Sequence, residues 1–310
     1  MRRPNRLLLA SLWFLGLACT REPEQAPPSA GDPAENNLHA PPAPLENEVA
    51  MMPSLLSRVT EPELPLVDPP SEWRAGWRLN GGNTWSYRYV QEMHLGGAMA
   101  SGQRMQVEGV LKVSATSPES ADVELMAGTA RVFVDGAPPA EAQREQPLEP
   151  QRYAALIRQS DHRQEPEDAL VWAMLSFPER PTPIGVPVSR AVTMPVQGAE
   201  GPMQTSGTAT WTLLSFVRCA DHLCAVYRHD LRIADLTVPA GMRGSYRAGA
   251  RSLGFTLVDI TEGALHLHRS ATTMQVHAEV PAGVPIDGVP LEQREQLEMI
   301  QEHFHEVTRL

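Results

Sequence analysis

The chain has 310 residues, of which 42% are hydrophobic and 20% charged, and its 26 basic and 37 acidic side chains give a formal net charge of −11. This acidic balance argues against a nucleic-acid partner, because contacts with phosphates need a basic surface. Apolar runs stay shorter than the roughly 18 residues that a membrane span needs, so the sequence predicts no transmembrane helix.

The amino terminus has the layout of a secretory signal. Arg2, Arg3 and Arg6 form a basic segment, and residues 7–17 form an apolar segment that is too short to span a bilayer. We therefore expect residues 1–18 to be a signal peptide.

The end of this segment, LGLAC at residues 15–19, resembles the lipobox of bacterial lipoproteins, in which a small residue precedes a cysteine. Gly16 and Leu17 depart from the residues that the family prefers there. The resemblance implies that Cys19 carries the acyl chains that anchor the protein to a membrane. Thr20, in place of Asp, implies the outer membrane by the rule for enterobacterial lipoproteins. The alternative is an ordinary signal peptide that leaves Cys19 as a spare thiol.

Residues 20–70 hold 12 of the 29 prolines, nine acidic residues and two basic ones. This composition predicts a disordered tether, so the region 19–71 is interpreted as a lipidated cysteine followed by a spacer. Five apolar residues near the end of the tether are expected to dock on the domain that follows: Leu55, Leu56, Leu64, Leu66 and Val67.

From Glu72 onward, apolar and polar residues alternate, which is typical of antiparallel strands with one buried face. We expect strands over residues 84–93, 105–115, 121–135, 203–218, 224–236, 252–261, 264–269 and 272–280. Residues 72–310 are therefore predicted to form one mainly β domain with a minor helical part (α+β minor). Its sheet would be an antiparallel β-sandwich or a half-barrel.

Two helices are expected beside these strands. A proline and two acidic residues at 166–168 favour a short mid-chain helix over 169–176. At the carboxyl end, a helix over 291–308 is predicted because apolar residues there recur at helical spacing: Leu297, Ile300, Phe304 and Val307.

A weak internal repeat links two of the expected strands. MQVEG at residues 105–109 and MQTSG at residues 203–207 lie 98 residues apart, and each begins a strand, a turn and a returning strand. Either the domain is a duplicated β unit or two similar hairpins match by chance.

The cysteines at 219 and 224 flank a four-residue turn between two strand-like segments. Cβ atoms across such a hairpin neck come close enough for a disulfide, and a secreted protein meets oxidising conditions. We expect a structural Cys219–Cys224 disulfide. The less favoured alternatives are a metal site that includes His222 and a redox pair.

Large apolar residues at alternating strand positions are the candidates for lining a ligand cleft: Trp85, Tyr87, Tyr89, Met105, Met203 and Trp211. The competing and simpler interpretation is that they fill a core. His266 and His268 are expected on one strand face with His277 on the next strand, which makes them weak candidates for a metal site. Solvated histidines are the favoured interpretation, so we expect no cofactor.

Motifs for catalysis are absent from the sequence: there is no Gly-x-Ser-x-Gly, no Ser-x-x-Lys at Lys112 and no phosphate-binding glycine loop. We therefore do not expect an enzyme. Gly-x-x-Trp-x-Tyr at residues 82–87 and Phe-Pro-x-x-Pro at residues 177–181, followed by Gly185, are similar to segments of bacterial lipoproteins with a β-rich periplasmic domain, a group without an assigned activity. This resemblance implies location and architecture only.

Together these features predict an envelope lipoprotein, anchored by its acyl chains at the outer membrane, with its domain in the periplasm or at the cell surface. Its β domain would bind or support an envelope protein without catalysis. The first alternative is a periplasmic carrier of an apolar ligand, a lipid or a lipoprotein acyl chain, in a half-barrel like that of the lipoprotein-localisation chaperones. A metal-binding or enzymatic domain is the lesser alternative.

Overall fold

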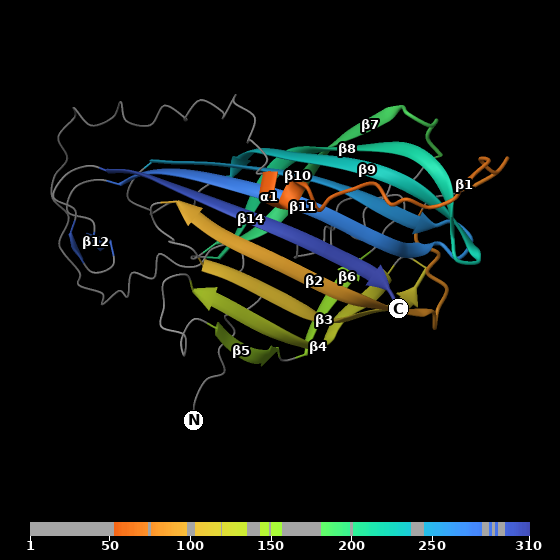
Figure 1. The fold of residues 1–310 in the computed structure, drawn as a ribbon, viewed down its shortest axis with the longest axis horizontal. Helices are drawn as coiled ribbons and strands as arrows, with labels where there is room; N and C mark the ends of the chain where they lie inside the picture. The colour runs from red at the N-terminus through yellow and green to blue at the C-terminus, as the bar shows by residue number, and fades with distance from the viewer. Residues whose placement is uncertain are drawn as a thin grey trace.

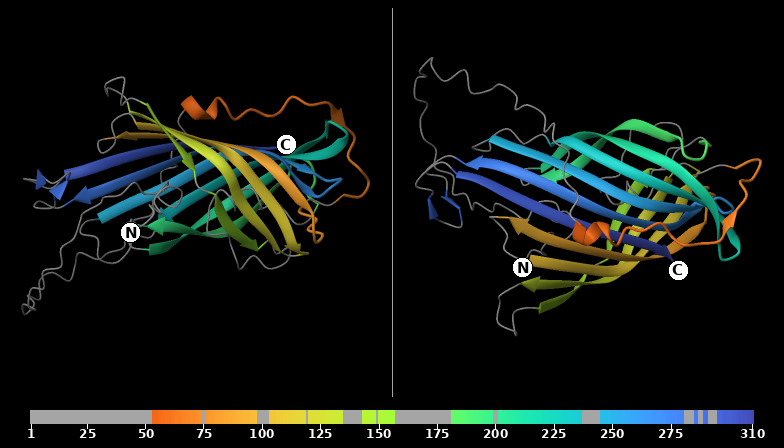
Figure 2. Two further views of the ribbon diagram at one scale, coloured as in Figure 1. Left: turned by 90° about the horizontal axis from the view of Figure 1, so that it is seen from below. Right: turned by 45° about the horizontal axis from the view of Figure 1, so that its top comes forward.

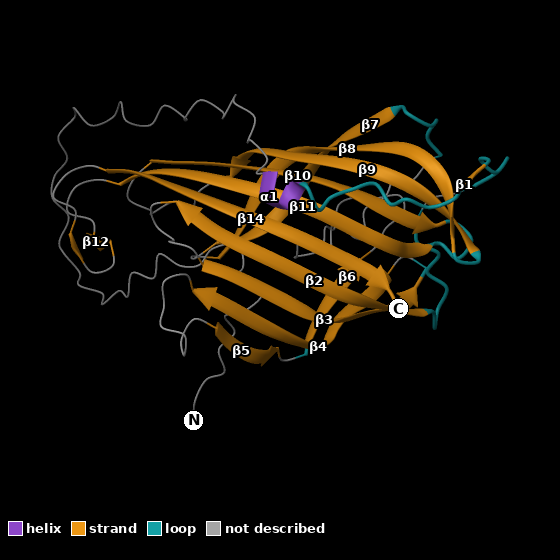
Figure 3. Cartoon of the chain, viewed as in Figure 1, coloured by secondary structure: helices purple, strands orange, loops and turns teal. Residues whose placement is uncertain are grey.

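A computed structural model describes residues 53–73, 76–97, 103–118, 120–134, 143–148, 150–156, 181–198, 201–236, 245–280, 285–286, 289–290 and 295–310. These residues form a mainly β fold, as predicted (Figures 1 and 3). Twelve strands belong to one antiparallel sheet, and a small second sheet has two strands. Within the described part, no helix is both long and apolar enough to cross a membrane.

Most of the elements are long strands, and three of them, β1, β12 and β13, have only two residues each. Their bounds are α1 Pro53–Leu56, β1 Leu66–Val67, β2 Thr84–Gly97, β3 Gln103–Ser117, β4 Ser120–Val134, β5 Gln143–Leu148, β6 Gln151–Leu156, β7 Pro187–Gly198, β8 Gly201–Cys219, β9 His222–Leu236, β10 Ser245–Asp259, β11 Ala264–Val280, β12 Pro285–Ile286, β13 Val289–Pro290 and β14 Glu295–Arg309.

The main sheet joins two meanders through the last strand of the chain. Its order is β1-β8-β9-β10-β11-β14-β2-β3-β4-β5, with β7 also pairing with β8 and β6 with β4. Among the described strands, nothing pairs the β1/β7 edge with the β5/β6 edge, so the sheet is open. It is strongly twisted, and its β2–β4 half crosses its β7–β9 half (Figure 2). This single open sheet corresponds to the half-barrel alternative and not to two stacked sheets.

One face of the twisted sheet, called the inner face here, carries the main core. The core cluster takes side chains from both halves, among them Tyr87 on β2, Val123 on β4, Tyr227 on β9 and Val307 on β14. Burial of these apolar groups away from water is the main driving force for the fold. The inner face is therefore where the two meanders hold together.

The predicted carboxyl-terminal helix is wrong: residues 295–309 form β14, which lies between β11 and β2. Period-two alternation is hidden there because β14 is covered on both faces. Val307 packs in the inner core, whereas Phe304 packs with Leu55 on the outer face. The buried polar residues Gln301, His303 and His305 lie among these apolar residues, so the apolar spacing resembles that of a helix. Pairing with two neighbouring strands outweighs that local pattern.

The end of the expected tether docks on the domain, as predicted, and its helix α1 lies on the outer face of the sheet. Leu55 of α1 is buried against Phe304 and Ala271. Arg58 pairs with Glu92 at 2.6 Å, and its guanidinium carbon lies 3.8 Å from the centre of the Phe304 ring. Farther along, Leu64 and Val67 pack against buried residues, and β1 pairs with the end of β8. Leu66 is the exception, because its side chain is 75% exposed.

The two matching pentapeptides occupy equivalent places. Met105 is the third residue of β3 and Met203 is the third residue of β8, and each strand continues through a tight turn into its antiparallel partner. The expected hairpins are thus confirmed, whereas duplication of the unit stays a prediction. The mid-chain helix at 169–176, Cys19 and the signal peptide fall outside the described residues.

Candidate functional site

The predicted ligand-lining residues gather on the inner face. Trp85, Tyr87, Tyr89, Met105 and Trp211 all belong to the main core cluster, and none is more than 8% exposed. The side chain of Met203 lies outside the described part. The structure therefore brings the candidates together, but in a packed interior.

Aromatic rings concentrate at one end of this interior. The rings of Trp77 and Trp85 are 5.3 Å apart and edge to face, and Trp77 contacts Tyr87 in the same way at 6.4 Å. Trp73 meets Phe216 edge to face at 5.1 Å. Edge-to-face pairs of this kind add to the stability that burial gives.

The middle of the inner face is polar, which the sequence analysis did not foresee. One continuous row of directly paired residues crosses the sheet there: Trp211, His229, Gly254, Ser270, His305, Gln91, Val107 and Ala130. Directly paired residues of antiparallel strands point to the same face. The row is therefore apolar at both ends, and its polar side chains, His229, Ser270, His305 and Gln91, lie in its centre between β9 and β2.

Four histidines, His229, His268, His303 and His305, lie in and beside this row; we call them the inner histidines. All four are buried. The rings of His229 and His268 stack at 5.1 Å with an interplanar angle of 12°, and those of His303 and His305 stack at 5.7 Å. Sequence analysis placed the second pair on a helix, where residues two apart do not share a face. In a strand they do, which is why they meet here.

The first pair depends on a glycine. Gly254 lies between His229 and Ser270 in the row, and a Cβ atom at position 254 would lie 2.7 Å from Nε2 of His229. The absent side chain lets the His229 ring lie across β10 and reach His268. His268 is held in turn by hydrogen bonds with Thr256 Oγ1 at 3.0 Å and Ser270 Oγ at 3.2 Å.

Burial sets the protonation of these rings. It lowers the pKa of His229 and of His305 to about 4 and that of His303 to about 3, and it places the pKa of His268 well below the ordinary value. Within the described part, Nε2 of His229 and Nδ1 of His305 make no hydrogen bond. The inner histidines are therefore neutral at pH 7, and a proton added there would be a buried charge without an acceptor.

The Ser270–His268 contact is the described arrangement nearest to a nucleophile with its base. The partner on the other ring nitrogen is the Thr256 hydroxyl and not a carboxylate, and all three side chains are buried. A substrate would have to enter the core to reach Ser270. The geometry thus favours a structural role for this contact.

The weak metal candidates are not assembled as expected. A register shift between Leu257 and Val258 makes His266 the extra residue of a β-bulge in β11. His266 therefore leaves the inner face on which His268 lies and reaches the cysteine pair instead. The side chain of His277 lies outside the described residues, so only two of the three can be placed.

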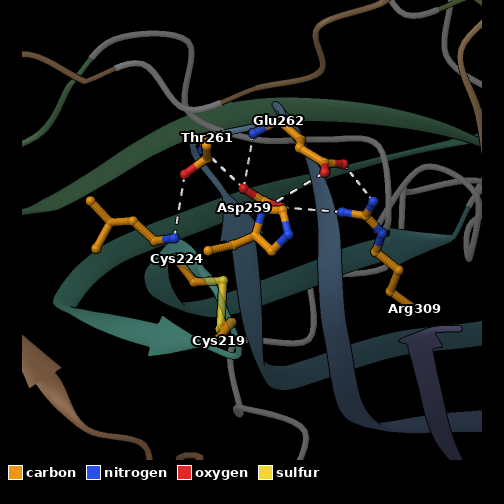
Figure 4. Close-up of a disulfide and its surroundings, with 8 residues drawn as sticks. Cys219, Cys224, Asp259, Thr261, Glu262 and Arg309 are labelled. Carbon is orange, nitrogen blue, oxygen red and sulfur yellow. Dashed lines mark hydrogen bonds and ion pairs between the residues drawn. A yellow bond between two sulfur atoms is a disulfide. The ribbon is translucent and has the colours of Figure 1, made fainter.

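The predicted disulfide is confirmed at the other end of the sheet. Cys219 and Cys224 are bonded across the β8–β9 turn, with their Cα atoms 6.0 Å apart (Figure 4). Ala220 in the turn has a φ of 53°, a left-handed conformation that a tight turn requires. The pair is buried in a small cluster with Val217, Val226 and Leu257.

A charged cluster surrounds Asp259, beside the disulfide (Figure 4). The Asp259 carboxylate is fully buried and accepts backbone hydrogen bonds from Thr261 and Glu262, each at 2.9 Å. Its other oxygen lies 3.1 Å from Arg309 and 3.1 Å from Nδ1 of His222. The carboxylate thus closes the β10–β11 turn and ties the end of β14 to it.

Two groups of possible ligand atoms stand out among the described residues. His222, Asp259 and Glu262 form one, and Cys219, Cys224 and His266 form the other, each with its ligand atoms within 4.8 Å of one another. In the first, Arg309 already pairs with both carboxylates. A cation there would have to compete with the guanidinium, which makes the acidic group a structural ion-pair network.

Comparison with known proteins adds nothing to this geometry: no protein-family model matches the chain, and no curated protein matches it in sequence.

Proposed function

We propose that the chain is an envelope lipoprotein, anchored at the outer membrane through Cys19, whose β domain is a non-catalytic binding or scaffolding module. The signal-like amino terminus and the LGLAC segment support the anchor. The observation that carries the module is the packed inner face, where the candidate ligand-lining side chains fill one core. Recognition then falls to the outer surface and the edges of the sheet.

An edge of the sheet offers apolar surface for such recognition. Ile184, Val186 and Val188, which lead into edge strand β7, are 38–48% exposed. Val186 and Val188 are two apart where the chain enters β7, which places them on one side of the strand, whereas Ile184 lies in the preceding turn. Exposed apolar residues that lie together favour contact with a protein partner.

The second candidate function is a carrier of an apolar ligand. It is favoured by the open sheet and by the position of all five described candidates on its inner face. A ligand would have to enter between the two halves of the sheet and displace side chains that pack against each other. The two functions therefore differ in what fills the inner face: packed side chains in the binding module, and a bound apolar ligand in the carrier.

The anchor is tested by comparing the full chain with a Cys19→Ser variant in a bacterial host. We expect the wild type to incorporate labelled fatty acid and to sediment with outer membranes, and the variant to do neither. A wild-type chain that is released without label would refute the anchor.

The module is tested by native mass spectrometry of the mature Cys19→Ser chain made in an oxidising periplasm, followed by solvent extraction. The proposal expects the mass of the polypeptide alone, two hydrogens light for the disulfide. A bound, extractable mass of lipid size would refute it and favour the carrier. Trp85→Ala and Trp211→Ala would then be the variants that test the carrier site.

A further inference from the structure

The bulge histidine and the cysteine pair form one of the two groups of three metal-ligating atoms found among the described residues, and the one whose ligands no guanidinium already pairs. Sγ of Cys219, Sγ of Cys224 and one ring nitrogen of His266 all lie within 4.8 Å of one another. A tetrahedral zinc site with Zn–S bonds of about 2.3 Å and Zn–N bonds of about 2.0 Å places its sulfur and nitrogen ligand atoms roughly 3.5–3.8 Å apart. The ring nitrogen is thus within reach, whereas the two sulfurs are bonded to each other and must first separate.

We propose that reduction of the Cys219–Cys224 disulfide creates a metal site, formed by Cys219, Cys224 and His266, for an ion that prefers thiolate and imidazole ligands, such as Zn²⁺ or Cu⁺. In the oxidised protein both sulfurs are bonded to each other, so the site is closed. The proposal does not depend on the lipid anchor or on a protein partner.

The strand geometry explains why His266 is available for this role. As the extra residue of the β-bulge, it has no directly paired partner on β10, where Val258 pairs with Leu265 and Leu257 with Leu267. Bulges commonly redirect a side chain in this way. His266 is also only partly buried, whereas both cysteines are buried, so an ion would approach from the histidine side.

The surroundings suit a cation held by sulfur. Val217, Val226 and Leu257 surround the cysteines and limit access of water. The Asp259 carboxylate lies on the neighbouring strand, because Asp259 pairs directly with Cys224. Thiolate and imidazole together select zinc and copper over magnesium and calcium, which prefer oxygen ligands. Three protein ligands leave one position of a tetrahedral ion open.

The chemistry balances with a thiol reductant. A dithiol passes two electrons and two protons to the protein disulfide, which becomes two thiols while the reductant becomes a disulfide. Zn²⁺ or Cu⁺ then binds the two sulfurs as thiolates, whose protons pass to the solvent, and the ring nitrogen of His266 completes the set. With the Cα atoms held 6.0 Å apart by the hairpin, rotation about the side-chain torsions can separate the sulfurs.

The test uses the mature chain with Cys19→Ser, so that only two thiols are present. The disulfide is reduced with a phosphine, which is oxidised to a phosphine oxide with oxygen from water. The reduced protein is desalted in the absence of air and titrated with Co²⁺ as a spectroscopic substitute for Zn²⁺. We expect one ion per chain and a thiolate-to-cobalt charge-transfer band in the reduced protein, and no such band in the oxidised protein. A folded, reduced chain without the band would overturn the proposal.

Two variants separate this site from its neighbours. His266→Ala should weaken cobalt binding about tenfold or more, since loss of even an outer partner of a metal ligand commonly costs that much. His222→Ala is the matched control, because Nδ1 of His222 contacts Asp259. Unchanged binding in His266→Ala, or loss of the band in His222→Ala alone, would overturn the assignment. If reduction unfolds the chain, Zn²⁺ must restore its native tryptophan fluorescence, and failure to do so would count equally against the site.

Discussion

Gly254 is the position at which the inner face is most sensitive to a single added methyl group. A Cβ atom there would lie inside van der Waals contact of both the carbonyl oxygen of Arg269 and the ring of His229. The ring can rotate away only by giving up its stack on His268, and the carbonyl oxygen belongs to the paired backbone of β11. Gly254→Ala therefore forces either the ring or the strand to move.

The size of the effect follows from two opposing contributions. Overpacking of a filled core costs about 1–3 kcal/mol. Replacing a strand glycine with alanine returns roughly 0.5–1 kcal/mol by restricting the unfolded chain. Because one of the two clashing atoms is backbone, we expect the upper half of the first range to apply. The net loss in the free energy of unfolding should be about 1–2.5 kcal/mol.

The assay is urea unfolding of the mature Cys19→Ser chain, followed by tryptophan fluorescence. Gly96→Ala is the control, because the atom nearest to its added Cβ, the carbonyl oxygen of Ile300, would be 3.8 Å away. That variant should be about 0.5–1 kcal/mol more stable than the parent, because only the restriction of the unfolded chain acts there. A Gly254→Ala protein as stable as Gly96→Ala would refute the close packing of the inner histidines.

Three other outcomes are expected from the same unfolding assay. Below pH 6.5 the histidines of the unfolded chain bind protons, whereas the inner histidines of the folded chain stay neutral to about pH 4. The free energy of unfolding should therefore fall by up to about 1.4 kcal/mol per pH unit per histidine between those values. An unfolding midpoint that is flat from pH 7 to pH 5 would contradict the burial of these rings. Arg309→Met should cost about 3–5 kcal/mol, because it leaves the buried Asp259 carboxylate without its guanidinium partner; a loss below 1 kcal/mol would show that the cluster is solvated. Replacing Cys219 and Cys224 with serine should cost about 2 kcal/mol for so short a loop, and no change in the urea midpoint would mean that the reduced hairpin is equally well ordered.

The strands could be predicted where one face is buried and the other meets water. Trp85, Tyr87 and Tyr89 alternate with polar residues, and all three lie on the inner face of β2. The same rule failed for β14, where Phe304 packs outward and Val307 inward. A strand covered on both sides carries no alternating signal, so periodicity alone cannot separate it from a helix.

The polar centre of the inner face could not be found from the sequence because it depends on register. His229 and His305 are 76 positions apart and meet the same row only through the pairing of β9, β10, β11 and β14. Each histidine considered alone is most often a solvated strand residue. What the sequence does hold is the spacing of two between His303 and His305, which becomes informative once the segment is known to be a strand.

At the cysteine pair, the one extra residue of the bulge in β11 decides which histidine ring lies beside the sulfurs. In sequence, His222 lies between Cys219 and Cys224, so local spacing favours it as their partner. In the fold it contacts Asp259, on the adjacent strand β10, at 3.1 Å. His266 is 42 residues beyond Cys224, yet the bulge in β11 turns it toward the disulfide. Without that extra residue, the strict alternation of β11 would keep His266 two positions from His268 on a shared face, as the sequence analysis expected. The metal site proposed above therefore depends on the bulge as much as on the cysteines, and the different outcomes expected for His266→Ala and His222→Ala test that dependence directly.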